Sequence, residues 1–114
     1  MSVRLLYLRP AELGPYLEQL AALERDISYP IADGQDRFVL SHGPEYHPFF
    51  SGFGEAHFLL ALHGDEVIGC VAGVRKRVRT PRGEVMGGYV GDLKLRRDWR
   101  GKGVPARMLS HALL

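Results

Sequence analysis

The segment Gly88–Leu114, GYVGDLKLRRDWRGKGVPARMLSHALL, is the stretch on which the interpretation of the whole sequence depends. It predicts a strand over 89–95, a basic loop over 96–104 and a helix that begins at 104 or 105. Pro105 suits the first turn of a helix, where its missing N–H removes no intrahelical hydrogen bond. One face of this helix is apolar, because the following residues recur at helical spacing: Val104, Met108, Leu109, Ala112 and Leu113.

The loop between this strand and this helix has the composition of an anion-binding site. Gly101 and Gly103 allow turns in which backbone N–H groups point inward, and the amino end of the helix adds about half a positive charge. The loop contains one acid, Asp98, and four basic residues: Arg96, Arg97, Arg100 and Lys102. A phosphate-bearing ligand is therefore expected here. The alternative is a basic loop that only caps the helix.

Neither the Walker pattern nor the G-x-G-x-x-G dinucleotide pattern fits this loop. The sequence RGKGVP instead resembles the acetyl-CoA loop of the GNAT superfamily of N-acetyltransferases, whose pattern is Q/R-x-x-G-x-G/A. Arg100 and Gly103 match the first and fourth positions, whereas Pro105 replaces the final Gly or Ala. Pro105 has no N–H, and a hydrogen bond to a charged group is worth about 1.5–3 kcal/mol. Without compensation, CoA binding would weaken roughly 10- to 100-fold.

The resemblance implies an α/β (α+β) fold with a mixed, mostly antiparallel sheet flanked by helices. It also implies transfer of an acetyl group from acetyl-CoA to a primary amine. The loop backbone would hold the pyrophosphate with help from Arg100 and Lys102, and the backbone of 93–95 would align the pantetheine arm. The cofactor-binding residues implied in this way are Leu93, Lys94, Leu95, Arg100, Gly101, Lys102, Gly103, Val104 and Pro105.

The same resemblance directs the search for catalytic residues to the strand before the loop. In many relatives a general base lies four or six residues ahead of the strand's last hydrophobic residue, which corresponds here to Gly91 and Tyr89. The nearest carboxylate is Asp92, and strict alternation turns it to the opposite face from Tyr89. A bulge at Gly91 would re-aim it. Asp92 and Tyr89 are the candidate catalytic residues, with Glu84 or a water relay as alternatives for the base.

The composition predicts one globular domain over residues 1–114, with 46% apolar and 25% charged residues. No segment approaches the length of a membrane span, and the first residues lack the features of a signal peptide, so a cytoplasmic location is expected. The single cysteine, Cys70, excludes an internal disulfide and is interpreted as a buried, inert thiol. Residues 1–74 carry 4 basic and 10 acidic side chains, whereas residues 75–114 carry 11 basic and 3 acidic ones. The carboxyl half is therefore the half that faces an anion.

The remaining chain divides into short periodic segments. A strand over 3–8 is followed by an amphipathic helix with apolar residues from 13 that ends near 26. The segment 28–55 is too aromatic for a linker and is interpreted as a packed loop with one or two helical turns. Its aromatic residues either border the acceptor site or cover the core. Three strands joined by tight turns, over 57–63, 66–78 and 84–95, predict an antiparallel meander, and close backbone approach or bulges are expected at Gly69 and Gly73.

Two further ligand classes are considered and set aside. His42 and His47, with Glu45 between them, do not have regular ligand spacing, so no metal site is predicted. His57 and His63 are interpreted as surface or turn residues. The basic cluster over 75–82 lacks interleaved aromatic residues, which favours a solvated hairpin over a nucleic-acid-binding one.

A GNAT domain usually continues beyond the helix that follows the loop. The sequence is therefore interpreted as the amino-terminal part of such a domain, ending after that helix. Completion by another chain segment, or pairing of an exposed strand in a homodimer, is expected to accompany this arrangement. A non-catalytic CoA-binding or interaction module is the alternative function. The acceptor amine is not identified by the sequence.

Overall fold

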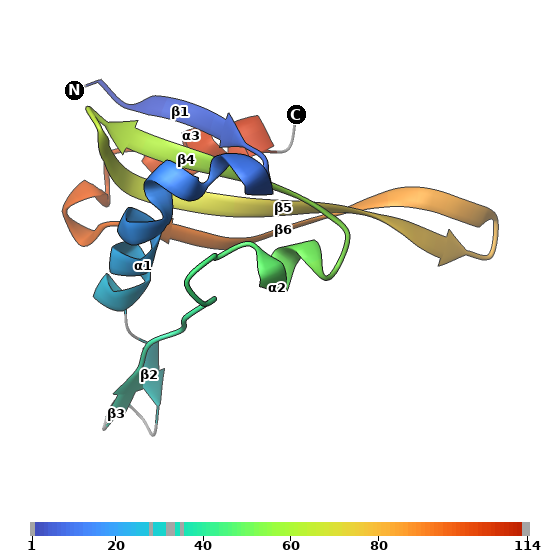
Figure 1. Cartoon of the computed structure of the whole chain (residues 1–114), viewed down its shortest axis with the longest axis horizontal. Helices are drawn as coiled ribbons and strands as arrows, with labels where there is room; N and C mark the ends of the chain where they lie inside the picture. Colours follow the sequence, from blue (N-terminus) through green and yellow to red (C-terminus); the bar gives the residue numbers. More distant parts are fainter. Residues whose placement is uncertain (1, 28, 32–33, 35, 113–114) are drawn as a thin grey trace.

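The computed structural model describes residues 2–27, 29–31, 34 and 36–112. Its main feature is an antiparallel four-stranded sheet with the order β1-β4-β5-β6 (Figure 1). The strands are β1 (Arg4–Leu8), β4 (Glu55–His63), β5 (Glu66–Thr80) and β6 (Gly83–Leu95). This arrangement confirms the predicted mixed α/β fold and the antiparallel meander, and the strands β5 and β6 are longer than the sequence patterns indicated.

Helices cover both faces of this sheet. The α1 helix (Leu17–Asp26) and the short α2 helix (Pro48–Ser51) lie on one face, and α3 (Val104–Ala112) lies on the other (Figure 1). Each face has its own core, the first including Leu20, Phe50 and Phe58 and the second including Trp99 and Met108. The middle strands are consequently apolar on both faces, which explains why β4 has the nearly continuous apolar sequence FLLAL.

The first helix begins later than its apolar spacing suggests. Two 3₁₀ turns, Pro10–Glu12 and Gly14–Tyr16, precede α1, and each has proline in its first turn. Leu13, Leu20 and Leu23 nevertheless pack in the core as expected. Glu24 is also buried on this helix, although its side chain is charged. Among the described residues, no helix has the length and apolar character needed to cross a bilayer.

The segment between α1 and β4 contains a hairpin that the sequence analysis did not predict. Strands β2 (Tyr29–Ile31) and β3 (Asp36–Phe38) pair antiparallel, and the rings of Tyr29 and Phe38 stack at 5.4 Å. Three-residue strands are too short to show a reliable period. The expected short helical turn is confirmed as α2. Residues 28, 32, 33 and 35 of the predicted loop, and Leu113 of the predicted helix face, lie outside the described residues.

The hairpin of β5 and β6 extends well beyond the body of the molecule (Figure 1). Its basic side chains are exposed, including Arg75, Arg77 and Arg79, and Arg77 pairs with Glu84 at 3.5 Å. This agrees with the interpretation of a solvated hairpin.

A bulge interrupts β6 just before the glycine loop. Cys70 pairs with Lys94 and Ala72 pairs with Gly91, so Asp92 and Leu93 lie opposite one residue of β5. Asp92 has φ +57°, a conformation that non-glycine residues rarely adopt. The predicted bulge is therefore confirmed.

Of the two glycines expected to make close backbone contacts, one does. A Cβ at Gly69 would lie 2.8 Å from the carbonyl oxygen of Lys94, which leaves no room for a side chain. At Gly73 the nearest atoms would be 3.8 and 3.9 Å away, an ordinary contact distance, and β5 continues through it without a register shift toward β6. The expectation for Gly73 was wrong.

Candidate functional site

The glycine loop lies between a buried tryptophan and the start of α3. Gly101 and Gly103 have φ values of +79° and +77°, and no atom lies within 4 Å of a Cβ placed on either residue. Such positive φ values favour glycine and leave the backbone accessible. Trp99 packs in the core with Val104 and Met108, which anchors both ends of the loop. The helix begins at Val104, at the predicted boundary, with Pro105 in its first turn.

The basic residues of the loop differ in their surroundings. Arg96 forms ion pairs with Glu66 and with Asp98, the latter at 3.2 Å. Arg97 and Arg100 are exposed and line a hollow of about 540 Å³ together with Ile27 and Arg37. The ammonium group of Lys102 lies 5.1 Å from the centre of the Trp99 ring. Arg97, Arg100 and Lys102 are thus the cations of this loop that face solvent.

A second group of charged residues is buried on the α1 face of β6, beside the bulge. The Lys94 ammonium lies 3.2 Å from Oε2 of Glu24 and 3.1 Å from Oδ1 of Asp92. The side chains of Lys94 and Glu24 are only 2% and 4% exposed. Burial lowers the pKa of Lys94, but the two carboxylates, Asp92 foremost, outweigh this effect and raise that pKa above its ordinary value.

His42 joins this group from the loop before α2. Its Nδ1 lies 2.5 Å from Oε2 of Glu24, and its backbone N–H donates to the same oxygen at 3.0 Å. The imidazole stacks on the rings of Tyr46 and Phe50, with centroid distances of 5.5 and 5.0 Å. In a neutral imidazole, a carboxylate bound to Nδ1 favours the tautomer with the proton on Nδ1, which leaves Nε2 as an acceptor. No partner for this Nε2 is found among the residues that the structure describes.

Tyr46 completes the group and binds Asp92. Its hydroxyl donates a hydrogen bond to Oδ2 of Asp92 and lies 3.5 Å from the sulfur of Cys70. Burial, followed by the nearby Cys70 and Asp92, raises the pKa of Tyr46, so its phenol stays protonated. Burial likewise raises the pKa of Cys70 to about 12, which agrees with the predicted inert thiol.

The backbone at this group is strained. Tyr46 and Asp92 are the two non-glycine residues with positive φ in the described part of the chain, and they are hydrogen-bonded to each other. Such conformations cost on the order of 1–3 kcal/mol each and persist where the surroundings enforce them, often at functional sites. We call Glu24, His42, Tyr46, Asp92 and Lys94 the charged cluster.

The residues selected from sequence are only partly brought together. Because of the bulge, Asp92 faces α1, as Tyr89 does, and the Tyr89 phenol lies over Gly91 in the position that a Cβ would need. No hydrogen bond joins Tyr89 to Asp92 among the bonds found. Glu84 lies on the distal hairpin with Arg77, eight residues from Asp92 and roughly 26 Å along the strand. Glu84 therefore does not belong to this group.

Sequence reasoning missed Glu24, His42 and Tyr46 as members of the site. Glu24 offered one signal, because it lies beside Leu20 and Leu23 on the buried side of an amphipathic helix, where an unpaired charge is costly. His42 and Tyr46 offered none, since both lie in a segment without periodicity. His42 had been considered only as a metal ligand; in the described residues it binds Glu24, and no group of three or more possible metal ligands occurs there.

Comparisons with known proteins complete this description. The sequence matches the family model described as acetyltransferase (GNAT) family over residues 17–113. An acetyltransferase structure from Trypanosoma brucei has 16% identity and a TM-score of 0.61, with 98% of this chain and 72% of that chain covered. A ribosomal-protein-alanine N-acetyltransferase from Brucella melitensis biovar Abortus 2308 has 16% identity and a TM-score of 0.61, covering 97% and 69%.

An aminoglycoside acetyltransferase from an uncultured soil metagenomic sample, in complex with sisomicin, is also similar. It has 16% identity and a TM-score of 0.63, with 96% of this chain and 66% of that chain covered. At these identities the structural matches concern the fold. No curated protein matches the sequence.

Proposed function

The chain belongs to the acetyltransferase (GNAT) family, and from this premise we propose that it transfers an acetyl group from acetyl-CoA to a primary amine. Family membership supports acyl transfer in general. The observation that carries the finer proposal is the bulge in β6. It turns Asp92 toward the buried charged cluster, and the exposed basic glycine loop begins directly after the same strand. Amine acetylation needs both a bound thioester and a group that takes the proton of the amine.

The loop residues fit a CoA pyrophosphate. Gly101 and Gly103 leave their backbone open, Arg100 and Lys102 supply positive charge, and the N-terminal turn of α3 faces the same loop. Val104 and Pro105 would position that turn, although Pro105 provides no donor. The backbone of Leu93, Lys94 and Leu95 would align the pantetheine arm along the outer side of β6, an edge strand of the sheet. When bound, acetyl-CoA supplies an activated thioester.

The chain's own proton acceptor is best assigned to His42. Its Nδ1 is held by Glu24, so Nε2 carries a lone pair, and stacking on Tyr46 and Phe50 fixes the ring. Two carboxylates against one lysine leave the cluster with one net negative charge while His42 is neutral. That charge favours an approaching ammonium and stabilises the imidazolium that forms when His42 takes its proton. This is the geometry of a base oriented by a carboxylate.

Asp92 and Tyr89 keep roles in this proposal. Both oxygens of Asp92 are engaged, by Lys94 and Tyr46, so Asp92 acts more readily as a charge that holds the cluster together than as a free base. Its unusual φ places the bulge, where the N–H groups of Asp92 and Leu93 are candidates to polarise the thioester carbonyl. Tyr89 borders the site where its phenol lies over Gly91.

A CoA-binding module without turnover is the second candidate. Pro105 favours it, because the loop offers one N–H fewer than the family pattern. The two functions differ in the release of free CoA thiol.

The test is a thiol-release assay with acetyl-CoA and a mixed set of primary amines. We expect amine-dependent release that falls when Asp92→Asn is introduced, with little change in the affinity for CoA. Stabilisation of the chain by CoA without any thiol release from any amine would favour the binding module. Unchanged turnover in Asp92→Asn would remove Asp92 from the mechanism.

A further inference from the structure

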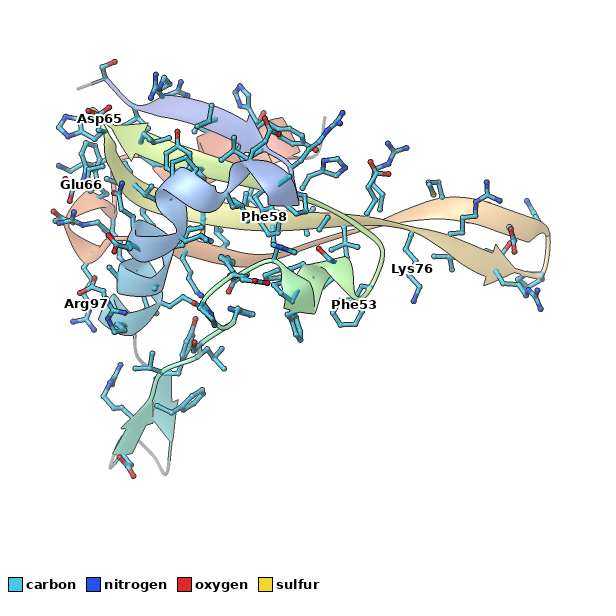
Figure 2. The ribbon with its side chains drawn as sticks, viewed as in Figure 1. Phe53, Phe58, Asp65, Glu66, Lys76 and Arg97 are labelled. Atoms are coloured by element: carbon cyan, nitrogen blue, oxygen red, sulfur yellow. The ribbon has the colours of Figure 1, made fainter. Side chains whose placement is uncertain are left out.

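An apolar groove of about 310 Å³ lies between α2 and the root of the β5–β6 hairpin. Figure 2 labels two of the residues that line it, Phe53 after α2 and Lys76 on β5. Three aromatic side chains around it are about half exposed, at 52%, 48% and 55% for Phe49, Phe53 and Tyr89. Large aromatic residues gathered at one exposed site are uncommon unless something binds there. The remaining lining residues are Val74, Val78, Gly87 and Gly88.

Two residues that line the groove, Phe49 and Tyr89, neighbour the charged cluster. On one side the ring of Phe49 makes an edge contact with His42, with centroids 5.3 Å apart. On the other side Tyr89 pairs in register with Val74 and covers Gly91, the residue before Asp92. A ligand lying between Phe53 and Tyr89 would therefore have one end near Phe49, whose ring contacts His42.

The groove accepts an apolar body because β6 has no side chains there. Gly87 shares the groove face with Tyr89, and the side chain of Val78 covers it, since a Cβ on Gly87 would lie 2.7 Å from Cγ2 of Val78. The aromatic walls and the Val78 side chain suit a flat ring or a branched aliphatic chain. Phe49 and Phe53 contact each other edge to face at 5.1 Å, so the wall is formed before any ligand enters.

Charge separates two classes of amine. The exposed Lys76 lines the groove, whereas Arg75 and Arg77 alternate to the other face of β5. A polyamine or polycationic sugar lying in the groove would place further ammonium groups beside Lys76, which is unfavourable. A monoamine places its single ammonium at the net negative cluster and only its apolar part in the groove.

We propose that this groove is the acceptor site and that it selects primary monoamines with an aromatic or branched apolar group, against polycationic amines. The role of the groove as an acceptor site rests on the proposed acetyl transfer. Binding of an amine in the groove can nevertheless be measured without turnover. It assigns Phe53 as a specificity-determining residue that does not touch the charged cluster.

The experiment combines binding and turnover on the 114-residue chain. Binding of 2-phenylethylamine and of spermidine is followed through the amide resonances of Gly87 and Gly88, and thiol release from acetyl-CoA is measured with the same amines. We expect 2-phenylethylamine to shift these resonances and spermidine not to. We expect Phe53→Ala to weaken 2-phenylethylamine binding and raise its KM about 10-fold with little change in kcat. Tyr7→Ala, an exposed aromatic on the opposite edge strand, is the matched control.

The outcomes separate the two proposals. Specific shifts without thiol release from any amine would support the groove and contradict acetyl transfer. Thiol release that is equal for both amines, without shifts at Gly87 and Gly88, would overturn the groove and leave acetyl transfer standing. An equal loss of binding in Phe53→Ala and Tyr7→Ala would also overturn it, because the effect would then not be local.

Discussion

Two regions next to the end of β6, the basic glycine loop and the charged cluster, differ in how their charged side chains are paired. At its carboxyl end, the loop with Arg97, Arg100 and Lys102 presents its cations to solvent. On its α1 face, the charged cluster pairs its ions with one another, so that Lys94 contacts both Glu24 and Asp92. This difference fits the proposed function, in which the loop binds an external anion while the charges of the cluster balance one another. Substitutions in the loop should change affinity, and substitutions in the cluster should change stability and turnover.

The largest expected effect is on stability, for Lys94→Met. Removing this ammonium leaves two buried carboxylates without their cation, which typically costs about 3–5 kcal/mol in the free energy of unfolding. Urea denaturation measures it. The exposed Lys76→Met is the control and should change the free energy by less than about 0.5 kcal/mol. The double variant Glu24→Gln/Lys94→Met should recover part of the loss, since one carboxylate is removed. If Lys94→Met and Lys76→Met lowered the free energy of unfolding equally, the claim that the charged cluster stabilises the fold would be contradicted.

The next effect is on turnover, for His42→Gln. Loss of a general base typically slows the reaction by 10²- to 10⁴-fold, so we expect kcat to fall on the order of 100-fold or more. The Kd for acetyl-CoA should stay the same, because His42 lies away from the loop. Steady-state kinetics and calorimetry on the same preparation test both statements. A variant that retains more than about half of the wild-type kcat would show that the base lies elsewhere.

A smaller effect is expected in the loop, for Arg100→Ala. Removing one exposed cation from a phosphate site should raise the Kd for acetyl-CoA about 10-fold, a loss of about 1.4 kcal/mol. The free energy of unfolding should stay within about 0.5 kcal/mol of wild type, because Arg100 is exposed. Arg79→Ala on the distal hairpin removes an equal charge outside the loop and should leave the Kd unchanged. The same rise in Kd in both variants would mean that only net charge matters.

The smallest effect concerns alkaline pH and Cys70. Its folded-state pKa is about 12 against an ordinary 9.0, so the unfolded chain loses the thiol proton first as pH rises. Because the folded-state pKa is raised, the protonated thiol contributes its full share to the free energy of unfolding below pH 9, and this contribution is lost between pH 9 and 12. Between pH 8 and pH 10, the free energy of unfolding should fall by about 1 kcal/mol more in the wild type than in Cys70→Ala. Parallel losses in both proteins would show that the thiol ionises as easily when folded.

The loop and its surroundings were predictable because their determinants are local. The strand, the loop and the helix boundary near 104 follow from residues adjacent in sequence. The bulge was indicated because the apolar residues Val90, Leu93 and Leu95 do not keep the alternation of a regular strand. The charged cluster has no such local pattern. Glu24 and Lys94 are 70 positions apart, and their contact exists only because α1 packs on the bulged face of β6.

The segment between α1 and β4 shows the same limit. The β2–β3 hairpin has strands of three residues, and Tyr46 reaches Asp92 only through a positive φ that no sequence pattern marks. The aromatic residues there divide by burial. Tyr46 and Phe50 are in the core, while Phe49 and Phe53 line the groove. Core cover is therefore confirmed for Tyr46 and Phe50, and the acceptor-site alternative stays a prediction for Phe49 and Phe53.

The most direct test of the account is a calorimetric titration of acetyl-CoA into the chain and into its His42→Gln and Arg100→Ala variants. We predict micromolar binding to the wild type, the same Kd in His42→Gln, and about a 10-fold higher Kd in Arg100→Ala. Absence of binding by folded wild-type protein would contradict the assignment of the loop. Loss of binding in His42→Gln alone would contradict the division of roles between the loop and the charged cluster.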